Sequence, residues 1–476
     1  MLYEKILDYA KRGLVPMHMP GHKRSTGLLP GGLAYDIDIS EIHGFDNLHA
    51  PSGVLKELSE KAAALYGAGH SQLLINGSTC GVLAAISACT RPGDRVLVAR
   101  NCHKSVYNAC ELNRLKTVYI NLGRDIGTQI AGSILPSEVE AALEEQPDIR
   151  LCVITSPTYE GVVSDIGAIA GILHGKGIPL FVDAAHGSHL RFFEPGYDAV
   201  SAGTDITVMS LHKTLPALTQ CALLHVREGL VSNDAIRRKL SVFETSSPSY
   251  VLLSSIDLCL SFLENSGAVF EEYKKALADF YARAESLKRL GILRAPGGGG
   301  GVPFFGLDIG KIVICTHGTA MSGIALMDTL REKHGIELEM AAPYYAVAMT
   351  GVVDGAESLK RLSDALFEID GGLTGRPAAE DERGKMPLPR KIAEPYEAAS
   401  TEGSFIPLTE AAGRVCLEYI WAYPPGIPLV TPGELLGENV IGGIHELAEA
   451  GVNIMSDYGK LPGCVFCAGI DNFAKI

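Results

Sequence analysis

Seven short apolar runs, separated by segments with helical periodicity, constrain the fold of this chain more than any other feature. Short apolar runs between polar turns are typical of buried parallel strands, and the segments between them have the length of crossover helices. The pattern predicts a three-layer α/β domain with a mostly parallel sheet. Between Gln72 and about Val226 the runs are SQLLIN, DRVLVA, KTVYIN, RLCVIT, IPLFVD, ITVMSL and ALLHV.

The rest of the chain divides around this domain, because 476 residues exceed what one hydrophobic core usually organises. The segments KIVICT, IELEM and YAVAMT, with a helix around SGIALMDTLREKH, predict a smaller α+β domain. A stretch rich in Gly, Pro and charge then predicts a linker. The predicted parts are a leader at 1–70, the large domain at 71–296, the small domain at 297–370, the linker at 371–389 and a C-terminal module at 390–476.

Two local signals refine this division. Ser247 and Pro248 precede an apolar helical stretch, and Ser as N-cap with Pro at the first helical position predicts that the helix opens there. The five glycines from Gly297 to Gly301 are interpreted as a loop or linker. A phosphate cradle would need a preceding strand and a following Gly-Lys-Ser/Thr, and neither is present.

Charge and composition exclude several classes of function. A net charge of −14, with scattered Lys and Arg, leaves no basic surface for nucleic acid. No apolar stretch reaches the roughly 18 residues of a membrane span, and the first residues lack the apolar core of a signal peptide. The 11 Cys residues form an odd number and are spread through predicted helices and strands, which favours reduced thiols over a disulfide framework. We expect a cytoplasmic protein that binds neither nucleic acid nor membrane.

The polar residues after two of the predicted strands are candidate ligands for a phosphate and for a ring nitrogen. Ser78 and Thr79 follow a strand and begin a helix, where free backbone N–H groups form an anion site or a simply capped turn. Asp183 ends another strand, where it could pair with a ring nitrogen, bind a metal or cap a turn. His186 and His189 follow it, but no further carboxylate or Cys completes a metal site, so we predict none.

Lys213 follows the strand ITVMSL in the sequence Ser210-Leu211-His212-Lys213. Burial disfavours an ammonium, and a neutral amine is the form that makes an imine, although such a lysine can also be structural. Together with the Gly-Ser-Thr turn and Asp183, Lys213 completes the contacts that pyridoxal 5′-phosphate requires at its phosphate, its ring nitrogen and its aldehyde carbon.

The amino-acid sequences of these and other segments resemble those of the bacterial ornithine/lysine/arginine decarboxylase family of fold-type I pyridoxal phosphate enzymes. The resemblance extends over nearly the whole chain, in family order. The matching segments are MPGHKRS, DNLHAPSG, NGSTCGVLAAI, RNCHKSVYNA, SPTYEGVVSDI, DAAHGSH, SLHKTLPALTQ, TSSPSY and YPPGIPLVTPGE.

The resemblance implies a role for each candidate residue. Lys213 would carry pyridoxal phosphate as a Schiff base, Asp183 would bind the ring nitrogen, and His103 and Ala185 would lie against the two ring faces. Glu434 would meet the distal cation of the substrate, and the segment TSSP would reach a phosphate in the partner subunit of a homodimer with shared active sites, unless it only caps a helix. The implied cofactor contacts are Ser78, Thr79, His103, Asp183, Ala185, His186, Ser210, His212, Lys213, Thr245 and Ser246.

Some features depart from the family or are left outside the predicted site. Many relatives have an acid where this chain has Ala184, and the chain resembles the short form without the receiver-like domain, for which a decamer is not expected. Cys464 and Cys467 form a CxxC without a second pair, so neither zinc nor redox chemistry is assigned to them. His43 and His49 are expected to make polar packing contacts rather than to bind substrate.

The resemblance implies decarboxylation of a basic amino acid, with arginine favoured over lysine and ornithine because the short forms resemble arginine decarboxylases. Two alternatives stay open. An aminotransferase or lyase of the same fold type would share Asp183 and Lys213, although no arginine clamp for an α-carboxylate is recognisable. A catalytically idle relative with a regulatory role would be expected to lose one of these two residues, and both are present.

Overall fold

The computed structural model describes residues 1–12, 17–20, 22–24, 32–125, 127–294, 302–375 and 388–473. The predicted glycine loop at 297–301 lies outside the described residues, as does most of the predicted linker at 371–389. The boundaries of the predicted domains stay a proposal.

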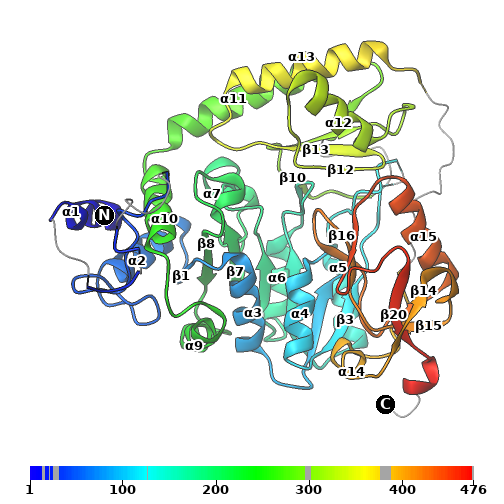
Figure 1. Cartoon of the computed structure of the whole chain (residues 1–476), viewed down its shortest axis with the longest axis horizontal. Coiled ribbons are helices and arrows are strands. Elements are labelled where there is room, and N and C mark those ends of the chain that lie inside the picture. Colours follow the sequence, from blue (N-terminus) through cyan, green and yellow to red (C-terminus); the bar gives the residue numbers. More distant parts are fainter. Residues whose placement is uncertain are drawn as a thin grey trace.

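A sheet of seven strands forms the centre of the molecule, in the order β1-β8-β7-β6-β4-β2-β3 (Figure 1). Each strand falls on one of the seven predicted runs, because a strand that is covered on both faces must be apolar along its length. The strands are β1 (His70–Leu74), β2 (Arg95–Ala99), β3 (Lys116–Ile120), β4 (Ile149–Thr155), β6 (Leu180–Asp183), β7 (Ile206–Ser210) and β8 (Ala222–Val226).

The sheet is mostly parallel, as predicted, and one of the seven strands runs in the opposite direction. β8 is antiparallel to both of its neighbours, β1 and β7. Only residues 211–221 separate β7 from β8, and they hold one short helix, α8 (Leu211–Thr214). A parallel connection needs a crossover of a dozen or more residues, so the chain turns back instead.

Helices cover both faces of this sheet. The connections that lead toward β3 place their helices on one face, and those that return toward β1 use the other face, since parallel crossovers are right-handed. The helices are α3 (Gly77–Cys89), α4 (Lys104–Leu112), α5 (Pro136–Glu145), α6 (Ile166–His174), α7 (Leu190–Phe193) and α9 (Asn233–Phe243). The order of the strands therefore reverses between β2 and β4, where open α/β sheets bind ligands.

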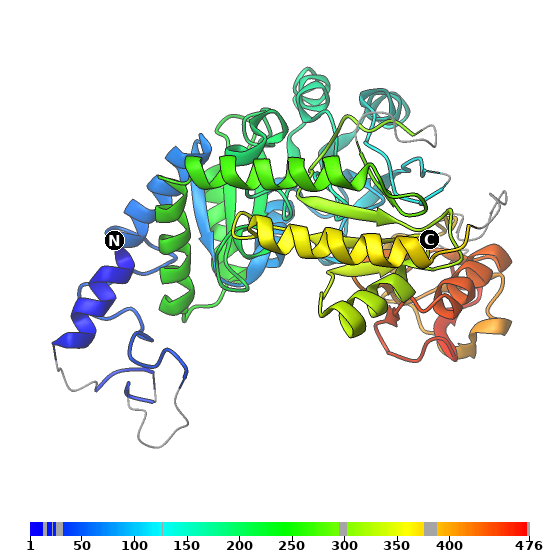
Figure 2. The same cartoon turned by 90° about the horizontal axis from the view of Figure 1, so that it is seen from above.

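The N-terminal residues pack against one edge of the large domain. α1 (Leu2–Lys11) lies beside α10 (Tyr250–Leu263), and α2 (Val54–Tyr66) leads into β1 (Figures 1 and 2). The cap of α10 is Ser249, whose side chain accepts the N–H of Leu252, so the prediction that Ser247 and Pro248 open this helix is wrong by two residues. Pro248 lies outside the helix, and a proline disfavours helical backbone at the residue before it, which here is Ser247.

The long helix α11 (Gly267–Ala284) leads from the large domain to a second, antiparallel sheet, and Figure 2 shows it running beside α13 (Ala356–Gly372). The sheet has the order β12-β13-β11-β9, and a short pair, β5 (Val162–Val163) and β10 (Gly306–Leu307), joins it to the large domain. Of the predicted strand IELEM only Met340 belongs to a strand of the structure. The elements are β9 (Gly291–Ile292), β11 (Lys311–Cys315), α12 (Gly323–His334), β12 (Met340–Ala342) and β13 (Tyr345–Met349).

The C-terminal residues form two small antiparallel sheets and a helix around their own apolar cluster, which includes Ile420, Val430 and Val465. Figure 1 shows them beside the β3 edge of the large sheet. The elements are α14 (Pro395–Ala398), β14 (Ser404–Pro407), β15 (Arg414–Cys416), β16 (Ile420–Ala422), β17 (Ile427–Val430), β18 (Leu435–Leu436), α15 (Glu438–Glu449), β19 (Ile454–Ser456) and β20 (Cys464–Ala468). Short 3-10 turns occur at 195–197, 408–410 and 470–473. Among the residues that the structure describes, no helix has both the length and the apolarity needed to cross a membrane.

Candidate active site

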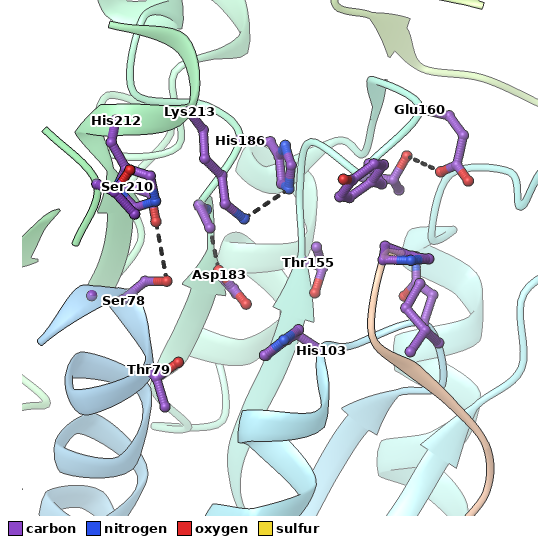
Figure 3. Close-up of a pocket in the computed structure, with 18 of the residues that line it drawn as sticks. Ser78, Thr79, His103, Thr155, Glu160, Asp183, His186, Ser210, His212 and Lys213 are labelled. Carbon is purple, nitrogen blue, oxygen red and sulfur yellow. Dashed lines mark hydrogen bonds between the residues drawn. The ribbon is translucent and has the colours of Figure 1, made fainter. Parts of the chain in front are cut away.

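A cavity of about 360 Å³ lies at the carboxyl ends of the central strands, across the point where the strand order reverses. The lining residues come from segments that are far apart in the sequence but end at the same edge of the sheet. Nine of them are predicted site residues, and Figure 3 labels all of these except Ala185: Ser78, Thr79, His103, Asp183, Ala185, His186, Ser210, His212 and Lys213.

One end of the cavity is suited to an anion. Ser78 and Thr79 lie in the first turn of α3, whose backbone N–H groups have no partner within the helix. Gly77 begins the helix with φ +71°, a left-handed conformation that favours glycine. The hydroxyl of Ser210 donates to that of Ser78 at 3.1 Å, and His212 Nδ1 donates to the carbonyl of Cys221 at 3.0 Å. Two hydroxyls, an imidazole and a helix start therefore converge on one point.

Lys213 faces the same cavity from α8. Burial lowers the pKa of its amine, while the carboxylates of Asp183 and Glu339 oppose that effect. Its Nζ lies 2.9 Å from Nε2 of His186, as the dashed line in Figure 3 shows. A lysine in this setting loses its proton more readily than one on the surface, which favours the nucleophilic amine.

Asp183, Ala185 and His103 line the middle of the cavity between these two features. Asp183 is buried at the end of β6, and its Oδ1 accepts the N–H of Ala185 at 3.1 Å. His103 caps α4 by accepting the N–H of Ser105 at its Nδ1, and burial lowers the pKa of its ring. The ring is therefore neutral, with its proton on Nε2.

The C-terminal residues supply one wall. The turn between β16 and β17 brings Pro425 and Ile427 to the cavity. Gly426 has φ +91°, and a Cβ at this position would lie 3.2 Å from the ring of His103. Its carbonyl also accepts the N–H of Lys104 at 3.0 Å. This turn therefore packs against His103, the residue expected to face the cofactor ring.

Glu434, which was expected to meet the substrate, does not line the cavity of this chain. Its side chain is only 1% exposed and forms an ion pair with Arg100, in which Nη2 of Arg100 lies 3.1 Å from Oε2 of Glu434. It also accepts the N–H of Thr431 at 2.7 Å, while Arg100 donates to the carbonyls of Pro428 and Leu429. Through these contacts the carboxylate of Glu434 and the guanidinium of Arg100 hold the end of β17 against the end of β2.

Thr245 and Ser246 also lie outside this chain's cavity. The N–H of Thr245 donates to Oδ1 of Asn76, and Asn76 is the residue that precedes α3. Ser246 is exposed. The ring of His49 contacts the carbonyl of Thr245 at 2.9 Å, so polar packing describes this histidine, whereas His43 is exposed and makes no such contact in the described structure.

Among the described residues, neither the cysteines nor the potential metal ligands form a second site. All 11 cysteines are free, and Cys464 and Cys467 lie on β20. Within the described ranges no three His, Cys, Asp or Glu side chains gather closely enough to hold a metal ion.

Sequence reasoning missed several residues of this site. Asn101, Arg124, Tyr159 and Glu160 line the cavity, and the buried Oδ1 of Asn101 has no hydrogen-bond partner among the described residues. Tyr159 and Glu160 belong to the segment SPTYEG, which marks the family but had no assigned role. Lys311 touches His186 from β11, and only the rarity of a lysine at the start of an apolar run could have indicated it.

Comparisons with known proteins agree with this geometry. Residues 1–289 match the family described as Orn/Lys/Arg decarboxylase, major domain, and residues 386–450 match its C-terminal domain. The chain belongs to this family. It is therefore a pyridoxal phosphate-dependent decarboxylase of a basic amino acid, and the predicted family, cofactor and type of reaction are confirmed.

Individual relatives and structures add detail. The chain is 32% identical to the arginine decarboxylase of Bacillus subtilis (strain 168) over 95% of its length and 94% of the relative's. It is also 32% identical to that of Halalkalibacterium halodurans, with the same coverage. The lysine decarboxylase LdcF of Francisella novicida has a TM-score of 0.83 at 17% identity, covering 98% of this chain and 80% of that one. The Sphingomonas wittichii serine palmitoyltransferase has a TM-score of 0.53 at 15% identity, covering 67% and 77%. The predicted fold-type I architecture is confirmed.

Proposed function

We propose that the protein decarboxylates L-arginine to agmatine and carbon dioxide, with Lys213 as the residue that carries pyridoxal phosphate. The observation that supports the assignment of residues most strongly is the convergence of Lys213, Asp183 and the first turn of α3 on one cavity. The preference for arginine rests on two relatives that are 32% identical over nearly the whole chain and are named arginine decarboxylases.

The cavity fits the cofactor. Ser78, Thr79, Ser210 and His212, with the start of α3, would hold its phosphate. The buried Asp183 carboxylate would hold a proton on the ring nitrogen, because a buried negative charge favours the protonated form of a group beside it. The unpaired Oδ1 of Asn101 shows that this polar surface lacks a partner within the described chain.

His103 and Ala185 would lie on either side of the cofactor ring. With Nδ1 occupied by Ser105, the imidazole ring of His103 is fixed in orientation and can offer only its face or its Nε2–H to the cavity. When bound, pyridoxal phosphate supplies an electron sink for the electron pair left behind as the α-carboxylate departs. The residues of the cavity would orient that carboxylate and return a proton to the α-carbon.

Glu160 is our candidate for the group that meets the guanidinium of the substrate. It and Asp183 are the acidic side chains that line the cavity in the described part of the chain. Figure 3 shows Glu160 on the side of the pocket opposite Ser78. Tyr345 OH and Thr158 Oγ1 donate to its two oxygens at 2.8 and 3.1 Å, which would orient the carboxylate for a bidentate contact with a planar cation.

We further propose a cytoplasmic homodimer in which Thr245 and Ser246 reach the phosphate of the partner subunit. The exposed position of Ser246 and the free state of all 11 cysteines support these two points. If the sites are shared, Ser246→Ala weakens cofactor binding although Ser246 does not line its own cavity. Sedimentation velocity would report the dimer. Unchanged cofactor affinity in the variant would contradict the shared site.

The substrate proposal is tested by measuring carbon dioxide release from arginine, lysine and ornithine at equal concentrations. Arginine should give the highest kcat/KM, and Glu160→Gln should raise KM for arginine with the cofactor still bound. Preference for lysine or ornithine would overturn the substrate, and an unchanged KM would overturn the role of Glu160. No release from any of the three would overturn the function.

A further inference from the structure

Gln220 has a backbone conformation that glutamine rarely adopts. Its φ is +81°, in the left-handed region that favours glycine. Of the five non-glycine residues with positive φ in the part of the chain that the structure describes, Gln220 is the one that lines the cavity. Residues in such conformations carry strain and persist where their surroundings fix them, often at ligand sites. The conformation of Gln220 therefore calls for a physical reason.

Hydrogen bonds on both sides of Gln220 hold its backbone in place. Its carbonyl accepts the N–H of Gly77, the first residue of α3, at 3.0 Å. The carbonyl of the next residue, Cys221, accepts the N–H of Leu211 at 3.0 Å. β8 then begins at Ala222, which pairs with both β1 and β7. The backbone of Gln220 is therefore fixed beside the turn that begins α3.

The groups proposed to hold the cofactor phosphate already use some of their protons within the protein. Ser210 donates its hydroxyl proton to Ser78 at 3.1 Å, as a dashed line in Figure 3 shows. His212 donates from Nδ1 to a backbone carbonyl at 3.0 Å, and the N–H of Gly77 is taken by Gln220. A phosphate presents several strongly accepting oxygens, so a further donor at this end of the cavity would complete its contacts.

The side chain of Gln220 can supply this donor. It begins beside Gly77, is exposed, and belongs to the lining of the cavity. A glycine would adopt the left-handed conformation without strain and would accept the same N–H, so the backbone bond alone does not require a glutamine. What glutamine adds to the backbone bond is an amide that can donate hydrogen bonds.

We propose that the side-chain amide of Gln220 donates to the phosphate of pyridoxal 5′-phosphate, which makes Gln220 a further cofactor-binding residue. This inference rests on the proposed phosphate site at the start of α3. The left-handed conformation lets one residue present its carbonyl to Gly77 and its side chain to the cavity. Gln220 thus both holds the turn that begins α3 and contacts the anion bound there.

The test measures the affinity of the apoprotein for pyridoxal 5′-phosphate by equilibrium titration, together with the melting temperature of the apoprotein. Gln220→Gly removes the amide and suits the backbone conformation. It should weaken binding about tenfold or more, while the apoprotein melts no lower than the native one. Gln220→Glu keeps the shape of the side chain and places a negative charge near the phosphate. It should weaken binding more than Gln220→Gly does.

Arg114→Gly is the matched control. Arg114 also has a positive φ, +52°, and its carbonyl also accepts the N–H of a glycine, Gly93, at 2.9 Å, but it does not line the cavity. Arg114→Gly should leave the affinity for pyridoxal 5′-phosphate unchanged. An equal loss of affinity in this control would overturn the specific role of Gln220.

The remaining outcomes are distinct. If the native apoprotein binds no pyridoxal 5′-phosphate, the proposed function fails before the role of Gln220 is reached. If the native apoprotein binds it and both Gln220 variants keep the native affinity, the role of Gln220 is overturned. Weaker binding by Gln220→Gly alone, with native affinity in Gln220→Glu, would also overturn it, because the glycine would then act by loosening the turn.

Discussion

The ion pair between Arg100 and Glu434 offers a sharp test of how the C-terminal residues serve the site. Both side chains are buried, 6% and 1% exposed, and they are joined at 3.1 Å. Glu434→Gln keeps the volume and removes the negative charge, leaving Arg100 charged and uncompensated. Breaking one partner of a buried pair costs about 3–5 kcal/mol. At roughly 2.1 cal/mol/K of unfolding entropy per residue, 476 residues give about 1 kcal/mol/K, so the melting temperature should fall by about 3–5 °C.

The assay is calorimetry of the apoprotein, in which a residue that only binds substrate would have no effect. Glu60→Gln is the matched control, because Glu60 pairs with Lys56 on the surface at 3.7 Å, with the two side chains 65% and 58% exposed. Its loss should cost under about 0.5 kcal/mol. An unchanged melting temperature for Glu434→Gln, combined with a raised KM for arginine, would refute our reading and restore Glu434 as a substrate contact.

Three further predictions follow from the site and its surroundings. Asp183→Asn should lower kcat by about 10²-fold or more, the typical cost of removing one electrostatic contact to a reacting group, and an unchanged kcat would exclude its role at the ring nitrogen. Ser78→Ala should weaken pyridoxal phosphate binding by about 1.5–3 kcal/mol, or about ten- to hundredfold, measured by equilibrium titration; unaltered affinity would place the phosphate elsewhere. Burial raises the pKa of Glu244 from the ordinary value of 4.5 to about 7. The folded protein therefore favours the protonated carboxyl, and the stability that this carboxyl contributes at low pH is lost as pH rises from 4.5 through 7. Glu244→Gln should therefore raise the melting temperature relative to the native protein at pH above about 7 but not near about pH 4.5, and an equal effect at both would contradict the shift.

The parts of the fold that sequence could predict are those in which one physical rule dominates. The seven central strands were recognisable because a strand covered on both faces must be apolar throughout. The direction of β8 was not, because it depends on how short the connection from β7 is, and α8 occupies only part of it. The cap of α10 fell on Ser249 because several adjacent serines compete, and only the backbone geometry selects one.

The candidate site divides in the same way. Asp183 ends a strand, and Ser78 and Lys213 follow strands. Residues at the carboxyl ends of parallel strands meet at one edge, so their convergence could be foreseen. The ion pair of Glu434 could not be predicted because its partner, Arg100, is more than 300 residues away and only tertiary packing joins them. Lys311 was missed for the same reason, since its contact with His186 joins β11 of the second sheet to the end of β6.

The most direct test of the central claim is mass spectrometry of the holoprotein after borohydride reduction, with Lys213→Ala beside the native chain. The account predicts that one peptide, containing Lys213, gains the mass of reduced pyridoxal phosphate, and that the variant shows neither this peptide nor release of carbon dioxide from arginine. Modification of a different lysine, or a variant that still decarboxylates arginine, would contradict it.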